Sequence, residues 1–130
     1  ILDLNEYEHL MGDELTAYFY YRREQAEMQC RMFQQAVDDI DRAIRMEPKE
    51  PLYHAERAVV YYRIGEFEEA LSSAKKSAEL NPEFGDAYRL MGICQLKLNQ
   101  REEGLAHLKK AAELGDESAQ TILTEEETKQ

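Results

Sequence analysis

The side chains that most often carry chemistry are few in this sequence and lie far apart. No two of the three histidines (His9, His54 and His107) have the short spacing typical of metal ligands. We expect His54 to lie in the core and His107 to be exposed. Cys30 and Cys94 are too distant in sequence for a zinc site or a disulfide-rich scaffold, so we predict two buried, inert thiols.

Adjacent carboxylates are the remaining candidates for acid–base chemistry. Asp38-Asp39, Glu68-Glu69 and Glu102-Glu103 are expected on polar helix faces, where solvation or local ion pairing accounts for them. The six glycines are scattered and form no phosphate-binding loop. We therefore predict that the chain is not an enzyme, and we expect neither a cofactor nor a metal.

The length and composition suit one domain with a real core. The chain has 130 residues, of which 43% are apolar and 33% charged, and no apolar stretch is long enough to span a membrane. Its net charge of −11 disfavours binding to nucleic acid or to an anionic membrane surface. Because the first residue is Ile1, we expect a processed chain or a fragment.

The elements that position these side chains repeat every 34 residues. Segments 43–48, 77–82 and 111–116 end alike, and the same register continues through the preceding residues. Two small positions and an apolar position between them recur in each repeat: Ala36, Ala70 and Gly104; Ala43, Ser77 and Ala111; Ile40, Ala74 and Leu108.

Each repeat is predicted to contain two helices. Residues 51–64 are apolar almost all round, and residues 68–80 carry apolar side chains at helical spacing. Gly65 is expected to end the first of these helices in a left-handed conformation, and Arg31 and Asn99 take the same place in the other repeats. No strand-like alternation occurs, so the fold class is predicted to be all-α.

This pattern resembles the tetratricopeptide repeat, which has the same period, the same small and apolar positions, and a closing proline. The resemblance covers residues 17–118. It implies a helical repeat solenoid, a right-handed superhelix of helix–turn–helix units, with units at 17–50, 51–84 and 85–118.

Two departures from the family pattern carry expectations. Glu24 stands where the later units have Ala58 and Gly92, so the first helix is expected to be longer, shifted or less closely packed. The third unit has Gly115-Asp116 in place of the proline, which predicts a helix stop followed by an N-cap.

Both ends of the chain differ from the repeats. Residues 119–130 are predicted to form a C-terminal capping helix in which Ala119, Ile122 and Leu123 cover the last unit. Its polar end is expected to be solvated and frayed, in preference to a functional acidic tail. Residues 1–16 are either the end of a degenerate preceding repeat with its linker or an unrelated N-terminal cap.

Arg23 and Arg57 occupy equivalent places in the first and second units. The family often has an arginine there. We expect an acidic partner on a neighbouring second helix, such as Asp39 or Asp41, in preference to a ligand contact.

The resemblance places the first helix of each unit on a concave surface. Subtracting the residues needed for packing leaves a candidate groove of Tyr18, Tyr21, Gln25, Met28, Leu52, Val59, Tyr62, Arg63, Arg89, Ile93, Leu96 and Lys97. Aromatic anchors, methionine and a few cations are typical of a recognition surface.

We therefore predict a non-catalytic protein–protein interaction module that holds a peptide or partner helix. Because Arg63, Arg89 and Lys97 gather in an acidic chain, the ligand is expected to be apolar with some negative charge. The alternatives are occupation of the groove by the chain's own ends and a structural self-assembly module that forms homo-oligomers.

One subclass of the family grips chaperone C-termini with a clamp of lysines, asparagines and an arginine. The corresponding residues here are Tyr21, Gln25, Glu56, Asp86 and Leu90. None of them is a cation, so binding of that type is not expected.

Overall fold

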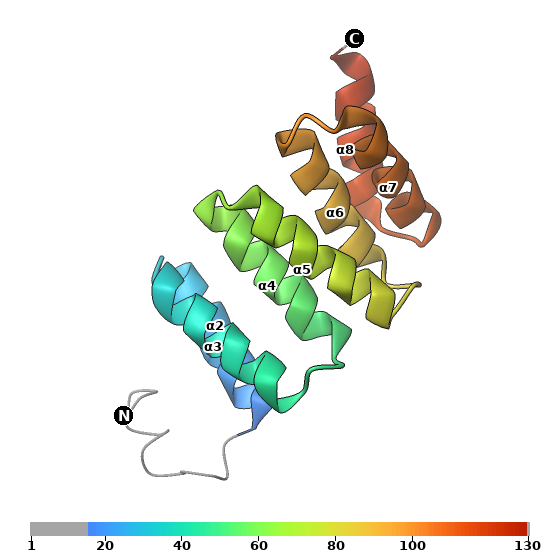
Figure 1. Ribbon diagram of the computed structural model, residues 1–130. Coiled ribbons are helices and arrows are strands. Elements are labelled where there is room, and N and C mark those ends of the chain that lie inside the picture. The colour runs from blue at the N-terminus through green and yellow to red at the C-terminus, as the bar shows by residue number, and fades with distance from the viewer. Residues whose placement is uncertain (1–15, 130) are drawn as a thin grey trace. The chain divides into compact units, whose positions relative to one another are not determined.

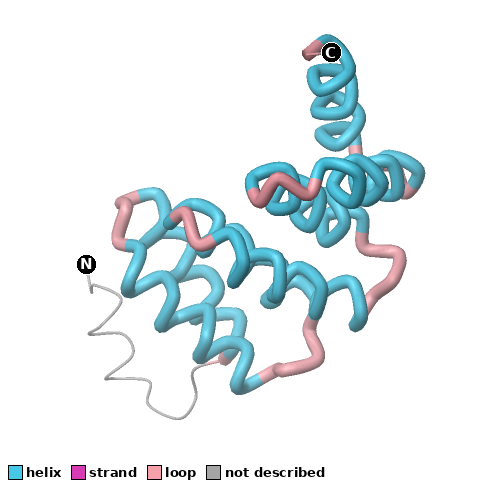
Figure 2. The backbone as a smooth tube through the Cα atoms, turned by 45° about the horizontal axis from the view of Figure 1, so that its top comes forward, coloured by secondary structure: helices cyan, strands magenta, loops and turns pink. Residues whose placement is uncertain are grey.

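The computed structural model describes residues 16–129, and all regular structure in that range is helical (Figure 2). The chain divides into two compact units between Lys49 and Glu50. The first contains α2 (Ala17–Gln29) and α3 (Phe33–Met46). The second contains α4 (Pro51–Ile64), α5 (Phe67–Leu80), α6 (Gly85–Lys97), α7 (Arg101–Glu113) and α8 (Glu117–Thr128) (Figure 1).

The predicted all-α helical repeat is therefore confirmed. The hypotheses about the N-terminal segment, and the interpretation of His9, fall on residues 1–15 and lie outside the described residues.

The first helices keep the period of the sequence. α2, α4 and α6 begin at Ala17, Pro51 and Gly85, which are 34 residues apart. Of the three outcomes expected from Glu24, a longer or shifted first helix is not observed, because α2 starts in register and has 13 residues, as α6 has. Looser packing stays a prediction, and Glu24 itself is completely buried.

The helix ends follow the predicted chemistry. Left-handed backbone conformations end four helices, with φ angles of 60° to 96°, at Arg31, Gly65, Asn99 and Gly115. The residue after each one donates its N–H back to the helix, as Glu66 does to the Tyr61 carbonyl at 2.9 Å. This arrangement satisfies carbonyls that the helix itself leaves unbonded. The predicted stop at Gly115 and cap at Asp116 are both confirmed, since the Asp116 side chain accepts from the Ala119 N–H at 2.9 Å.

Small residues let the helices of a pair approach closely. A Cβ on Gly92 in α6 would lie 2.6 Å from Cγ of Leu108 and 2.9 Å from the Gly104 carbonyl oxygen, both in α7. In α4 and α5, Ala58, Ala70 and Ala74 are fully buried. The recurring small positions are therefore requirements of helix packing.

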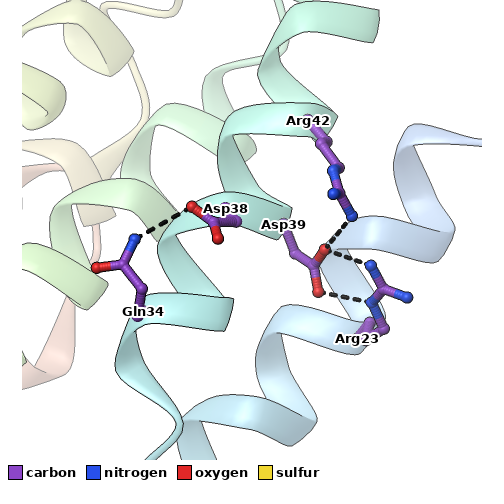
Figure 3. A network of polar contacts seen from close by, with 5 residues as sticks. All are labelled: Arg23, Gln34, Asp38, Asp39 and Arg42. Atoms are coloured by element: carbon purple, nitrogen blue, oxygen red, sulfur yellow. Dashed lines mark hydrogen bonds and ion pairs between the residues drawn. The ribbon is translucent and has the colours of Figure 1, made fainter. Parts of the chain in front are cut away.

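A buried ion pair joins the two helices of the N-terminal unit (Figure 3). Arg23 Nε donates to Asp39 Oδ2 at 2.6 Å and Nη2 to Oδ1 at 2.6 Å, with the two side chains only 4% and 2% exposed. Arg42 adds a contact of 3.3 Å to the same carboxylate. The predicted partner of Arg23 is thus confirmed. At the equivalent place in the second unit, Arg57 Nη1 donates to Ser73 Oγ at 2.7 Å.

Glu27 lies beside this pair, and its carboxyl group has a raised pKa. Burial, a hydrogen bond with Asp39 and the charge of Asp39 raise the pKa of Glu27 to about 8. The pKa of Asp39 is lowered despite its burial, because Arg23 and Glu27 hydrogen-bond to it.

Candidate binding pocket

The second unit contains a pocket of about 560 Å³, a volume within the usual range of ligand sites. Residues of α4, α6, α8 and the start of α7 line it. They are Tyr62, Ile93, Leu96, Lys97, Asn99, Arg101, Ile122, Glu126 and Lys129.

The apolar part of the pocket is held by the core. Ile93 and Leu96 lie one helical turn apart on α6, and both pack against the buried cluster of α7 and α8. Tyr62 packs against the cluster of α4–α6, and its ring centroid lies 5.4 Å from that of Phe67. All three lining side chains are half-buried. Packing against the core therefore restrains the positions of these three side chains.

The charged part comes mostly from the ends of α6, α7 and α8. Arg101 Nη1 contacts Glu126 Oε2 at 2.7 Å, and its Nη2 donates to the Glu126 main-chain oxygen at 3.2 Å. Lys129 Nζ lies 2.9 Å from Glu126 Oε1. Hydrogen bonds from Lys129 and Arg101 lower the pKa of the Glu126 carboxyl. With Lys97, the lining has three cations and one carboxylate, a positive site in an acidic chain.

Four of the predicted groove residues meet in this pocket, namely Tyr62, Ile93, Leu96 and Lys97. Three further predicted residues lie on α4 but do not line it. Val59 is half-buried against the core, Leu52 is half-buried at the start of the helix, and Arg63 is exposed at its end.

The remaining aromatic and polar candidates belong to α2 of the N-terminal unit. Tyr18 is 59% exposed, and its ring centroid lies 6.0 Å from that of Tyr21. Gln25 Nε2 donates to the Tyr21 hydroxyl at 3.0 Å, and Met28 is half-buried. These four residues share one helix, and their place in a groove stays a prediction.

Arg89 has closer partners than the sequence suggested. Its Nη1 contacts Asp116 Oδ2 at 2.5 Å and Asp86 Oδ1 at 3.2 Å. Asp116, from the turn before α8, neutralises Arg89 within the fold. This ion pair disfavours a role for Arg89 in binding a ligand.

Sequence reasoning missed the contribution of the capping helix and of the turn before α7. Asn99, Arg101, Ile122, Glu126 and Lys129 all line the pocket. The expectation of a solvated end is met by Glu125 and Glu127, which are exposed. The end is not frayed, however, because α8 continues to Thr128, and the Glu126 side chain is only 12% exposed. Ile122 was identified as apolar, but no sequence signal links Arg101 to Glu126, which lies 25 residues away.

Two predictions about reactive side chains were also wrong. Cys30 is exposed, whereas Cys94 is buried as expected, and burial raises the pKa of Cys94 to about 11. His107 is half-buried instead of exposed. Its ring stacks on Tyr88 with 6.2 Å between centroids, and the Gln95 amide lies 2.6 Å from Nδ1. Desolvation lowers the pKa of His107.

Across residues 16–129 we find no group of three His, Cys, Asp or Glu side chains placed to hold a metal ion. None of the helices described in that range is both long and apolar enough to cross a membrane.

Comparison with known proteins agrees with the fold and the period. The family profile of the tetratricopeptide repeat matches residues 51–84, which contain α4 and α5. The chain therefore contains a tetratricopeptide repeat at residues 51–84.

Among curated proteins, the chain is 31% identical over 65 residues to the small glutamine-rich tetratricopeptide repeat-containing protein 2 of Mycosarcoma maydis. The match covers 50% of this chain and 18% of that protein, so the chain spans only a small part of such relatives.

Solved structures show the same fold. The Sgt2 repeat domain from Aspergillus fumigatus superposes with a TM-score of 0.82 at 20% identity, covering 87% of this chain and 78% of that one. The first repeat domain of Spaghetti (RPAP3), bound to the HSP90 peptide SRMEEVD, gives 0.80 at 21% identity and covers 85% and 89%. At these identities the likeness is one of fold.

Proposed function

We propose that this chain is a non-catalytic protein-interaction module that binds a peptide or a partner helix at the pocket beside Tyr62, Ile93 and Leu96. The observation that carries the proposal is that four residues predicted as groove residues line one pocket in the second unit. The tetratricopeptide repeat at residues 51–84 supports an interaction role, because stacked repeats present extended surfaces to partners.

The lining favours an apolar ligand with some negative charge. Tyr62, Ile93 and Leu96 offer half-buried apolar surface, whose contacts supply most of the affinity. Lys97 is exposed and has no ion-pair partner among residues 16–129. An exposed ion pair contributes about 0–1 kcal/mol, so Lys97 mainly sets orientation and salt dependence.

The first repeat domain of Spaghetti (RPAP3), which has a similar fold, is bound to the HSP90 peptide SRMEEVD, an acidic segment. In the present chain, two of the five positions expected to form a chaperone clamp are unsuited to the task. Leu90 is only 4% exposed, and Asp86 is paired with Arg89. We therefore propose that an acidic partner is recognised beside Lys97 and Arg101, at the other end of α6.

Peptides selected from a random display library on the wild-type chain test this proposal. Tyr62→Ala should weaken a selected peptide by roughly tenfold, as loss of an aromatic anchor does. Lys97→Ala should weaken it by no more than about fivefold and should reduce its salt dependence. Calorimetric titration at low and high salt measures both effects.

Ile64→Ala is the matched control, because Ile64 is an exposed apolar residue of the same helix outside the pocket. Circular dichroism establishes that each variant is folded. Peptides that bind equally well to wild type, Tyr62→Ala and Lys97→Ala would place the binding site elsewhere.

Self-assembly is the alternative function, and the relatives named above give it no support. Light scattering from micromolar to millimolar concentration separates the two functions. A monomer throughout that range is the result expected for an interaction module.

A further inference from the structure

The capping helix changes character along its length. Ala119 and Leu123 are buried in one cluster with Leu108 and Ala111 of α7. Beyond Leu123 the helix continues as Thr-Glu-Glu-Glu-Thr, with no further apolar residue. The hydrophobic effect therefore holds the first half of α8, and polar contacts hold the second half.

Within that polar half, one carboxylate is turned toward the protein. Glu125 and Glu127 are exposed, whereas the Glu126 side chain is 12% exposed and contacts both Arg101 and Lys129. Glu126 thereby places a negative charge on the wall of a pocket whose other charged lining residues are cations.

This carboxylate is held by partners that are themselves accessible. The Arg101 and Lys129 side chains are 42% and 67% exposed. Ion pairs with exposed partners are weak, because water competes for both charges and salt screens them. An anion that enters the pocket can therefore take the place of Glu126 at little cost.

We propose that Glu126 is an internal competitor for the pocket, and that a ligand carboxylate next to an apolar group displaces it from Arg101. This inference rests on the proposed function, and it adds the chemistry of the partner and the response of the protein. The ligand's apolar group packs beside Tyr62 and Leu96, its anion pairs with Arg101, and the last turn of α8 is released.

Two dyes of similar shape but different charge test the exchange on the full chain. 8-Anilinonaphthalene-1-sulfonate is an apolar anion, and N-phenyl-1-naphthylamine lacks its sulfonate. Glu126→Gln should raise the affinity for the anionic dye by about threefold, the size expected for one exposed ion pair, and should leave the neutral dye unchanged. Added Arg101→Gln should remove the gain, and so should high salt.

Glu125→Gln is the matched control, since it removes the same charge from the same turn at an exposed position. It should bind the two dyes as the wild type does. An equal gain in this control would reveal a general charge effect and overturn the proposal. A gain for the neutral dye, or no gain in Glu126→Gln, would overturn it as well.

Hydrogen exchange on the wild-type chain gives a second measurement that needs no variant. The anionic dye should speed exchange of the amides of residues 124–128, and the neutral dye should not. Unchanged exchange with the anionic dye bound would overturn the displacement. Neither dye is a protein partner, so the exchange can be confirmed even if no selected peptide binds the pocket.

Discussion

At the scale of the residue, equivalent positions in the different repeats have different packing requirements. Glu24, Ala58 and Gly92 share one register position and are all completely or nearly completely buried. In α2 and α4 this position holds a residue with a Cβ. In α6 there is no room for a Cβ, because Leu108 and the backbone of Gly104 lie against Gly92. The steric demand of that position is therefore set by the partner helix as well as by the period.

Gly92→Ala should destabilise the second unit by roughly 1–3 kcal/mol, because an added methyl group forces α6 and α7 apart. Gly85→Ala is the control in the same helix. A Cβ on Gly85 meets its neighbours at an ordinary 3.6 Å, so the change should be neutral or stabilising by up to about 1 kcal/mol. Urea unfolding followed by circular dichroism measures both, and equal midpoints would contradict the tight crossing.

The protonated Glu27 predicts an unusual pH response for the N-terminal unit. Because its pKa rises from 4.5 to about 8 on folding, the native state binds more protons between these values, and stability falls as the pH rises through them. The lowered pKa of Asp39 acts in the opposite direction and removes stability only below its ordinary value of 3.8. The free energy of unfolding of the N-terminal unit should therefore decline between pH 5 and pH 8.

Glu27→Gln should flatten this decline, since the amide cannot ionise. Thermal unfolding of the full chain at several pH values in that interval measures the effect. Glu47→Gln, at an exposed position of the same unit, should retain the wild-type profile. A wild-type profile in Glu27→Gln would show that another group is responsible.

At the scale of the element, Asp116 joins the cap of α8 to the surface of α6. Its Oδ1 caps the Ala119 N–H at 2.9 Å while its Oδ2 pairs with Arg89. One short turn thus starts the capping helix and fixes the side chain of a neighbouring helix.

Asp116→Ala loses both interactions and should destabilise the second unit by about 1–2 kcal/mol. Asp116→Asn keeps a capping oxygen but loses the ion pair, so it should cost less. Glu117→Ala changes an exposed acidic residue of the same turn and should have little effect. Chemical unfolding of the three variants ranks them, and an equal loss in Asp116→Asn and Asp116→Ala would assign the whole effect to Arg89.

At the scale of the whole molecule, the chain consists of two compact units with their own buried residues. Ile40 and Leu108 hold equivalent positions in α3 and α7, and both are fully buried. In repeat proteins, stability is a sum of unit and interface terms, so a substitution in one unit can destabilise that unit more than the other.

Ile40→Ala and Leu108→Ala should each cost roughly 2–5 kcal/mol in the unit that carries the change. Hydrogen exchange should speed most in α2 and α3 for the first variant and in α6–α8 for the second. Equal acceleration throughout the chain in both variants would mean that the two units unfold as one.

The sequence by itself determined the repeat, the helix pairs and their left-handed ends, and it indicated an acidic partner for Arg23 without choosing between Asp39 and Asp41. These features depend on local chemistry: helical periodicity, residues that tolerate positive φ, and small side chains at fixed spacing. The same local pattern has the same structural effect in each repeat, so comparing the 34-residue segments with one another was enough to find these features.

Only the tertiary structure decided which groove residues meet and which side chains from other helices contact them. The Arg101–Glu126 and Arg89–Asp116 contacts join residues more than two dozen positions apart, and His107 is covered by side chains from α6. Such contacts depend on the directions in which side chains leave separate helices, which no local pattern encodes. Burial of Ala119 and Leu123 packs α8 against α7, and this packing is what brings the acidic end of the helix to Arg101.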